Sequence, residues 1–196
     1  MDKEQWVSIA KHDPGCGRAN MEQAWRERDY LAATDGHRIH LAGGYPKIEG
    51  IRYVDERQDT PPNVQVIFDV TDKASLVASL ELDKNVLKTL KTLASLKEWV
   101  RCTIKAEWDT PHVTLHGKGL ATGLQLELKI LNTNARHTSE ITVRLDYLWE
   151  AISWIKPDYK GTIDLYWDVR KTESPMLKVR AEDRDLTAII APMHKD

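Results

Sequence analysis

The feature that most constrains the fold is an internal repeat in the second half of the chain. Residues Leu82–Ile130 contain a Leu-Asp pair, an amphipathic helical segment, one strand and then two strands that read as a hairpin. Residues Leu145–Met193 contain the same elements in the same order. A repeated order of elements indicates that copies of one supersecondary unit stack to bury a shared core. We therefore expect two similar helix-plus-hairpin units in this part of the chain.

The helical segments of the two units carry the same apolar spacing. In each unit, three apolar residues stand at positions i, i+4 and i+7, which lie on one face of an α-helix. These residues are Val86, Leu90 and Leu93 in the first unit and Leu148, Ile152 and Ile155 in the second. Asp83 and Asp146 stand just before the apolar faces, where a side chain can accept hydrogen bonds from the free amides of a helix start. We expect both aspartates to be helix N-caps.

The strands that follow alternate apolar and polar residues. In the second unit, Leu177 and Val179 alternate with Lys178 and Arg180. This period of two is typical of a sheet that is buried on one face only. Each unit then has an apolar helix face and an apolar sheet face that it cannot cover alone. We expect the two units to pack helix against helix.

A second informative segment lies nearer the start of the chain. Tyr30–Ala42, with the sequence YLAATDGHRIHLA, reads as two short strands around an Asp35-Gly36 turn. Asp-Gly favours hairpin turns because glycine readily adopts a positive φ. This segment resembles the ATDGHR hairpin of bacterial DNA polymerase III beta sliding clamps. Thr187–His194, with the sequence TAIIAPMH, resembles the closing strand and the Pro-Met tail of the same family.

In the sliding-clamp family, the hairpin and the tail form one peptide-binding pocket, and the resemblance implies such a pocket here. The matching residues are Thr34, Gly36, His37, Arg38 and Ile39 in the hairpin and Ile189, Ile190, Pro192 and Met193 in the tail. A groove with Ile39 and Ile190 as its apolar floor and a few polar rim groups would suit a short linear peptide. Ala191 and His194 depart from the family, which usually has methionine and arginine at these positions.

The resemblance also implies how the chain divides. Residues 78–196 look like one complete clamp domain, whereas residues 1–77 look like a reduced domain that carries the hairpin and a linker. We expect no helix before the hairpin, because residues 1–17 are few and include Pro14, Gly15 and Gly17. Residues 43–62 read as a loop, and Val64–Val70 as a strand. Bacterial clamps have three complete domains, so encircling DNA would require a homo-oligomer of this chain.

A row of lysines suggests a surface that contacts DNA. Lys84, Lys88 and Lys91 lie opposite the apolar face of the first helical segment. A solvated helix face is the ordinary explanation of such a row. In clamps, however, the corresponding helices line the central hole, so the resemblance implies nonspecific contacts with double-stranded DNA. The second helical segment offers Glu150 and Ser153 in place of Lys88 and Lys91.

The composition excludes several other classes of protein. With 196 residues, 41% apolar content and a net charge of -2, the chain can form a core and has no overall attraction to a polyanion. Cys16 and Cys102 form no disulfide framework or metal-binding spacing. No segment approaches the roughly 20 apolar residues of a membrane span. The seven tryptophans occur singly, which favours core packing over a base-stacking platform. We expect a cytoplasmic protein without a membrane partner.

The sequence offers little support for catalysis. Asp35, His37 and His40 could be considered as metal ligands, but His37 and His40 would point to opposite faces of an extended strand. No second cluster at ligand spacing would complete the shell. Phosphate-binding glycine loops, nucleophile elbows and paired catalytic carboxylates are not visible either. We expect no enzyme activity, no metal and no cofactor.

The sequence therefore predicts an α+β, DNA-clamp-like fold built from pseudo-repeated units of a helix plus antiparallel sheet. The implied function is that of a sliding-clamp-like processivity or adaptor protein in DNA replication or repair, which recruits DNA polymerase or other proteins with clamp-binding motifs. The alternative is a non-encircling interaction module, such as a phage or mobile-element factor, that binds clamp-binding peptides. Ring closure on DNA would distinguish the two.

Overall fold

The computed structural model describes residues 1–12, 21–45, 48–53, 61–63, 71, 74–95, 101–106, 112–118, 124–133, 139–156, 158–168 and 176–193. The α-helices are α1 (Lys3–Ser8), α3 (Lys84–Ala94) and α4 (Leu145–Ile152). The first strands are β1 (Trp25–Arg28), β2 (Tyr30–Thr34), β3 (Arg38–Ala42), β4 (Ile48–Tyr53) and β5 (Ser75–Glu81). They are followed by β6 (Arg101–Ala106), β7 (His112–Lys118), β8 (Leu124–Thr133), β9 (Ser139–Arg144), β10 (Ile163–Trp167), β11 (Leu177–Ala181) and β12 (Leu186–Ile190).

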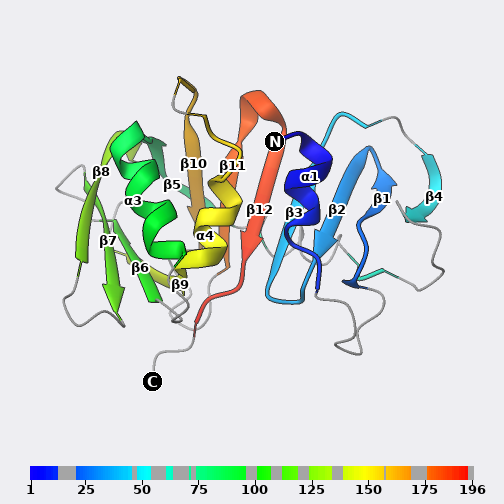
Figure 1. The fold of residues 1–196 in the computed structure, drawn as a ribbon, viewed down its shortest axis with the longest axis horizontal. Coiled ribbons are helices and arrows are strands. Elements are labelled where there is room, and N and C mark those ends of the chain that lie inside the picture. The colour runs from blue at the N-terminus through cyan, green and yellow to red at the C-terminus, as the bar shows by residue number, and fades with distance from the viewer. Residues whose placement is uncertain are drawn as a thin grey trace.

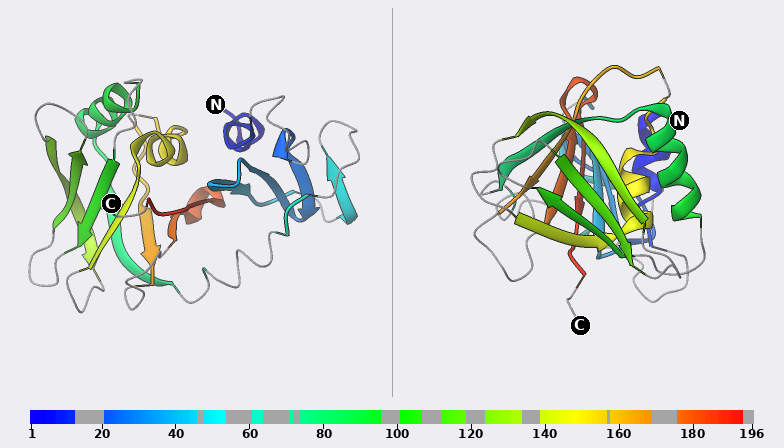
Figure 2. Two further views of the ribbon diagram at one scale, coloured as in Figure 1. Left: turned by 90° about the horizontal axis from the view of Figure 1, so that it is seen from below. Right: turned by 90° about the vertical axis from the view of Figure 1, so that its left-hand side faces the viewer.

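The strands form one antiparallel sheet that runs through the whole molecule. Their order is β4-β1-β2-β3-β12-β11-β10-β5-β8-β7-β6-β9. The three described α-helices lie on one face of this sheet, in front of the strands in Figure 1. Figure 2 shows the helices along one side of the molecule, with the strands curving beneath them. The main apolar core lies between these helices and the sheet. No helix in the described ranges is long and apolar enough to cross a membrane.

The internal repeat is confirmed by the order and the pairing of the elements. One unit is β5, α3, β6, β7 and β8, and the other is β9, α4, β10, β11 and β12. The first strand of each unit pairs with the second strand of the other, because β5 pairs with β10 and β9 pairs with β6. Helix α3 packs against α4, as the two apolar helix faces predict. This arrangement is the predicted α+β fold of pseudo-repeated units.

The described N-terminal part repeats the helix and the three strands that follow it in each of these units. Helix α1 is followed by β1, β2 and β3, and β4 pairs with β1 as β9 pairs with β6. The prediction of no helix before the hairpin is therefore wrong. A capping box begins α1: the amide of Gln5 donates to Asp2 Oδ1 at 2.7 Å, and the amide of Asp2 donates to Gln5 Oε1 at 3.2 Å. The side chains of Trp6 and Val7, on the inner face of this helix, are buried.

The interpretation of residues 43–62 as a continuous loop is also wrong, because β4 occupies Ile48–Tyr53. Gly50 sits inside this strand with φ 82° instead of ending it. The register between β1 and β4 shifts at Glu27/Arg28, and Arg28 has φ 56°. A glycine within an irregular strand pair is typical of a β-bulge, which bends a strand without stopping it. The predicted strand Val64–Val70 lies outside the described residues.

The two predicted N-caps have different outcomes. Asp83 caps α3, because its Oδ1 accepts hydrogen bonds from the amides of Asn85 at 2.7 Å and Val86 at 2.9 Å. Asp146 is not a cap, since α4 begins one residue earlier, at the buried Leu145. The Asp146 carboxylate instead forms an ion pair with Arg144. Its Oδ1 also accepts from the amide of Tyr147 at 3.0 Å. The prediction for Asp146 failed because the helix already includes this residue in its first turn.

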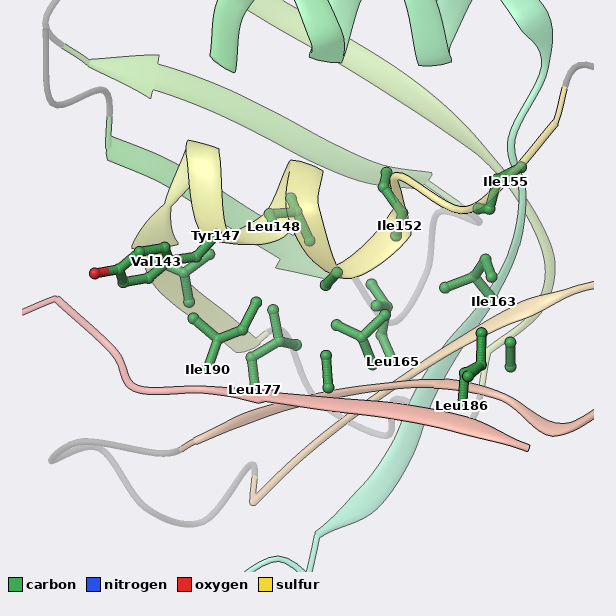
Figure 3. Close-up of a cluster of buried hydrophobic side chains, with 14 of the residues drawn as sticks. Val143, Tyr147, Leu148, Ile152, Ile155, Ile163, Leu165, Leu177, Leu186 and Ile190 are labelled. Atoms are coloured by element: carbon green, nitrogen blue, oxygen red, sulfur yellow. The ribbon is translucent and has the colours of Figure 1, made fainter. Parts of the chain in front are cut away.

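The apolar helix faces point into the core as predicted. Leu148, Ile152 and Ile155 are buried, and Figure 3 shows them above side chains of the sheet. In α3, Leu90 is buried, whereas Val86 and Leu93 are half-buried at the edge of the core. Leu87, which the periodicity did not single out, is also buried. The predicted apolar face of α4 is thus correct. The buried face of α3 includes the predicted Leu90 but is rotated by about one residue from the predicted face.

The strands and tryptophans agree with the predicted burial pattern. Leu177 and Val179 are buried, and Lys178 and Arg180 on the other face are not. The five described tryptophans all pack in the cores: Trp6, Trp25 and Trp167 are fully buried, and Trp149 and Trp154 are partly buried. Trp99 and Trp108 lie outside the described residues. Core packing of the tryptophans is confirmed for this part of the chain.

Helix α1 is attached to the rest of the molecule through Trp6. Its indole Nε1 donates to the backbone oxygen of Glu150 in α4 at 3.0 Å. Its ring stacks on His40 of β3, with 4.3 Å between the ring centroids. His40 is fully buried and its Nδ1 lies 3.0 Å from the backbone oxygen of Trp6, to which it donates as a neutral imidazole. Burial lowers the pKa of His40 to about 3.

This burial predicts a pH dependence of stability. The pKa of His40 in the fold, about 3, lies below its ordinary value of 6.5, so the unfolded chain binds more protons between these two pH values. The free energy of unfolding should therefore fall as the pH is lowered through this window, by up to about 1.4 kcal/mol per pH unit from this residue. Urea unfolding at a series of pH values measures the slope. His40→Gln should flatten it, whereas the same change at the exposed His37 should not. Equal slopes in both variants would contradict the assignment.

Candidate functional site

The hairpin of β2 and β3 is closed by its own polar side chains. Asp35 Oδ1 accepts hydrogen bonds from the amides of His37 at 2.8 Å and Arg38 at 3.0 Å. Thr34 Oγ1 accepts from the amide of Gly36 at 3.0 Å and donates to the backbone oxygen of Arg38. Gly36 has φ 89°, which favours glycine over any other residue. Local hydrogen bonds thus fix the shape of the turn, as the Asp-Gly motif predicts.

The hairpin and the C-terminal tail lie side by side. Strand β3 pairs with β12 along its whole length, with Ile39 opposite Ile189 and Arg38 opposite Ile190. Beyond the strand, the amide of Ala191 donates to the backbone oxygen of His37 at 2.8 Å. The amide of Met193 then donates to the backbone oxygen of Thr142 in β9, also at 2.8 Å. The tail therefore bridges the hairpin and the first strand of the last unit.

The predicted residues nevertheless divide between the two faces of the sheet. Ile39 and Ile189 lie in a small core with Trp25, Ala32 and Leu41, on the face away from the helices. Ile190 belongs to the main core beneath the helices, and in Figure 3 it points toward α4. Ile39 and Ile190 therefore do not form one apolar floor. A strand has a period of two, so the neighbouring positions Ile39 and Arg38, or Ile189 and Ile190, cannot share a face.

Arg38 occupies the centre of the helix-facing side. Its side chain is only 9% exposed and forms ion pairs with Glu150 of α4 and with Asp35, the latter at 3.3 Å. Its Nη2 donates to the backbone oxygen of Ile9 at 3.0 Å, just after α1. Burial lowers the pKa of Arg38, and the charge of Asp35 offsets part of this effect. One guanidinium group thus joins the hairpin to both α1 and α4.

Tyr147 of α4 lies between this group and a second arginine. The guanidinium of Arg38 is 4.3 Å from the centroid of the Tyr147 ring, and that of Arg144 is 4.2 Å from it. Burial raises the pKa of Tyr147, and Asp35 raises it further. Arg144 itself donates from Nε to Asp146 Oδ1 at 3.0 Å. Two cation–π contacts and their carboxylate partners therefore support the region where hairpin and tail meet.

The exposed part of the site comes from both segments. Gly36 and His37 are exposed, and Pro192 and Met193 are half-buried. Thr34, Ile39, Ile189 and Ile190 are buried and support the backbone instead. His37 is exposed in the turn while His40 is buried, so these two imidazoles do not converge. Within the described ranges, no three His, Cys, Asp or Glu side chains form a group that could hold a metal ion.

Sequence reasoning missed Tyr147, Glu150 and Arg144 as members of this region. Helical spacing could have placed Tyr147 and Glu150 on one side of α4, since they stand at i and i+3. The period of two in β3 could likewise have placed Arg38 and His40 on one face. The contact of Arg38 with α4 depends on the β3–β12 pairing, which no local pattern reveals. The lysines Lys84, Lys88 and Lys91 are all exposed on α3, as predicted, and lie apart from this region.

The sequence matches no protein-family model and no curated protein, whereas the fold matches solved structures. The β sliding clamp of C. crescentus superposes with a TM-score of 0.71 at 12% identity, over 98% of this chain and 62% of that one. DNA polymerase III subunit beta of Borrelia burgdorferi gives a TM-score of 0.69 at 14% identity, over 99% of this chain and 62% of that one. This chain has the bacterial β sliding-clamp fold.

A third clamp structure carries a peptide. The Helicobacter pylori β clamp, bound to a DNA ligase peptide, matches with a TM-score of 0.64 at 10% identity over 98% of this chain and 62% of that one. The chain therefore spans less than two thirds of the length of these clamps.

Proposed function

We propose that this chain is a sliding-clamp-like adaptor that recruits partner proteins through a peptide-binding site at the hairpin and the tail. The observation that supports it most is the contact between the two segments: the amide of Ala191 donates to the backbone oxygen of His37 at 2.8 Å. Segments far apart in the sequence thereby meet, which places the exposed His37 beside the start of a tail whose Pro192 and Met193 are half-buried. Their likeness to the family's pocket, at Thr34, Gly36–Ile39 and the Ile-Ile-x-Pro-Met tail, supports the same reading.

In this proposal the residues of the site have different roles. His37 supplies a polar rim, and Pro192 and Met193 supply an adjustable apolar surface, because a thioether adapts to varied side chains. Thr34, Ile39, Ile189 and Ile190 hold the strands in place from both faces of the sheet. Arg38 anchors the turn to α1 and α4. A site whose supporting residues are already buried and hydrogen-bonded loses little entropy when a peptide binds.

The partners of this site would be DNA polymerase or other proteins with a clamp-binding motif, and the role would be non-enzymatic. The peptide-bound Helicobacter pylori clamp, which shares the fold, supports this class of partner. We further propose that residues 1–77 and 78–196 act as a reduced and a complete clamp domain. The strand β5 spans Ser75–Glu81, so the proposed boundary between residues 77 and 78 falls inside this strand.

A peptide titration tests this function. A short peptide with a glutamine followed by leucine and an aromatic residue should bind with micromolar affinity, about 8 kcal/mol. His37→Ala and Met193→Ala should each weaken binding by about 1 to 2 kcal/mol, because a few anchor contacts dominate a small groove. Removal of residues 192–196 should abolish most of it. Isothermal titration calorimetry provides the measurement.

The double variant decides whether the two segments form one site. Its effect should be smaller than the sum of the single effects, because residues that line one pocket are coupled. Arg52→Ala, at an exposed position on β4, serves as the control and should leave binding unchanged. An effect of Met193→Ala with none from His37→Ala would mean that the segments do not act together. Ile39 is a poor target because its side chain is 2% exposed, and a charge there would disturb folding.

A second candidate function, encirclement of DNA by a homo-oligomer, is favoured by the arrangement of the helices. Figure 2 shows α1, α3 and α4 along one side of the molecule, and Lys84, Lys88 and Lys91 are exposed on α3. A row of lysines on one of these helices suits nonspecific contacts with the phosphates of double-stranded DNA. Without ring closure, the chain would instead be a non-encircling module that binds the same peptides.

Charge reversal on α3 tests the DNA surface. Lys84→Glu, Lys88→Glu and Lys91→Glu together should leave folding nearly intact, since exposed changes usually cost within about 0.5 kcal/mol each. They should weaken association with duplex DNA and flatten its dependence on salt, by close to one unit of log–log slope per lost phosphate contact. Fluorescence anisotropy at several salt concentrations measures the slope. An unchanged slope would identify these lysines as a solvated helix face.

A further inference from the structure

A cleft of about 610 Å³ lies at the other end of the β3–β12 junction, away from the hairpin turn and the tail. Three separate segments line it: the start of α1, the segment that follows α4, and the turn between β11 and β12. In Figure 1 the N-terminus and the β11–β12 turn lie near each other at the top, whereas the C-terminal end lies at the bottom. A volume of this size is typical of ligand-binding clefts.

The walls of the cleft combine buried apolar groups with aromatic edges. Trp6 and Leu186 are buried and belong to the main core. Trp154 and Tyr159 are half-buried and meet edge to face, with 4.9 Å between their ring centroids. Aromatic side chains held in this way present apolar surface at little cost in entropy. The cleft can therefore receive an apolar anchor side chain.

The carboxylates of the cleft are largely engaged within the protein. Asp2 caps α1 by accepting from the amide of Gln5. Asp183 accepts from the hydroxyl of Tyr159 at 2.6 Å and lies 3.6 Å from the Nε of Arg184. Burial raises the pKa of Tyr159 and the hydrogen bond to Asp183 raises it further, so the phenol remains a donor. Of the lining carboxylates, only Asp158 has no such partner among the described residues.

The cations of the cleft are more numerous and less engaged. Lys3 donates to the backbone oxygen of Gly43 at 2.8 Å, and Arg184 lies over Tyr159 with 5.7 Å from its guanidinium carbon to the ring centroid. Lys156 and Lys160 are exposed, and no ion pair joins them to another residue in the described part of the chain. The rim therefore has a surplus of positive charge centred on Lys156 and Lys160, beside an apolar wall.

We propose that this cleft is a second docking site, which takes an acidic segment of a partner protein with an apolar or aromatic anchor residue. The anchor would contact Trp154 and Tyr159, and the acidic side chains would pair with Lys156 and Lys160. A peptide suits this rim better than a nucleic acid does. Asp2, Asp158 and Asp183 would repel the closely spaced phosphates of a strand, whereas a peptide can place its charges selectively. The site does not depend on the hairpin and the tail.

Binding of a defined peptide to the full chain tests the proposal. The probe is fluorescein-labelled Asp-Glu-Trp-Leu-Glu-Asp, compared with Asn-Gln-Trp-Leu-Gln-Asn and with a short oligothymidylate, by fluorescence anisotropy. The acidic peptide should bind, and the amide peptide should bind about tenfold more weakly. Lys156→Glu with Lys160→Glu should weaken binding of the acidic peptide by about tenfold. The expected effect is no larger because each ion pair at the surface contributes modestly to the binding free energy. Thermal unfolding confirms that both variants fold.

Two controls make the outcome specific. Lys84→Glu with Lys88→Glu changes the net charge equally but lies on α3, and it should leave peptide binding unchanged. Met193→Ala, which disturbs the hairpin-and-tail site, should also have no effect, so the two sites can fail separately. Equal binding of the acidic and amide peptides, or equal effects of the two lysine pairs, would overturn the proposal. Tighter binding of oligothymidylate that depends on Lys156 and Lys160 would overturn it in favour of a nucleic-acid site.

Discussion

The pairing of β3 with β12 is the interaction on which the rest of this structure depends. It joins the N-terminal unit to the last unit in one continuous sheet, with Leu186 opposite Ala42 at one end and Ile190 opposite Arg38 at the other. Both candidate sites follow from it, since the hairpin meets the tail at one end and the charged cleft lies at the other. Trp6, His40 and Arg38 reinforce the joint from the helix side, because each contacts α1 or α4 as well as the sheet.

The repeat explains how much of the fold could be read from the sequence. Helix spacing around Leu90 and Leu148, strand alternation at Leu177 and Val179, and the N-cap at Asp83 are local signals, and the structure confirms them. The sequence prediction omits helix α1 because the proline and the glycines that follow it are typical helix breakers, whereas this helix of six residues depends on the capping pair Asp2 and Gln5. The sequence prediction omits strand β4 because it treats Gly50 as a strand breaker, although a glycine with a positive φ can be accommodated within an irregular strand pair.

The site itself was only partly predictable, for a different physical reason. The turn motif and the tail motif are each a continuous stretch of sequence, so the residues of each motif could be named from the sequence. The support beneath them is not contiguous: Arg38 meets Tyr147 and Glu150 only because β12 brings α4 over β3. The separation of Ile39 from Ile190 follows from the period of a strand and from the pairing register. Residues that match a family motif therefore need not share one face, and several of them act as structural supports for a small exposed rim.

Hydrogen exchange of single amides tests most directly whether hairpin, tail and helices form one unit held by Arg38. The amides of Ala191 and Met193 donate across the junction to His37 and Thr142, so both should exchange slowly, at rates close to those of the β12 core. Arg38→Ala removes the link to Asp35, Glu150 and Ile9, and it should accelerate exchange at both amides together, whereas Arg52→Ala should not. Fast exchange at Ala191 and Met193 in the unaltered protein, or protection that is unchanged in Arg38→Ala, would contradict this account.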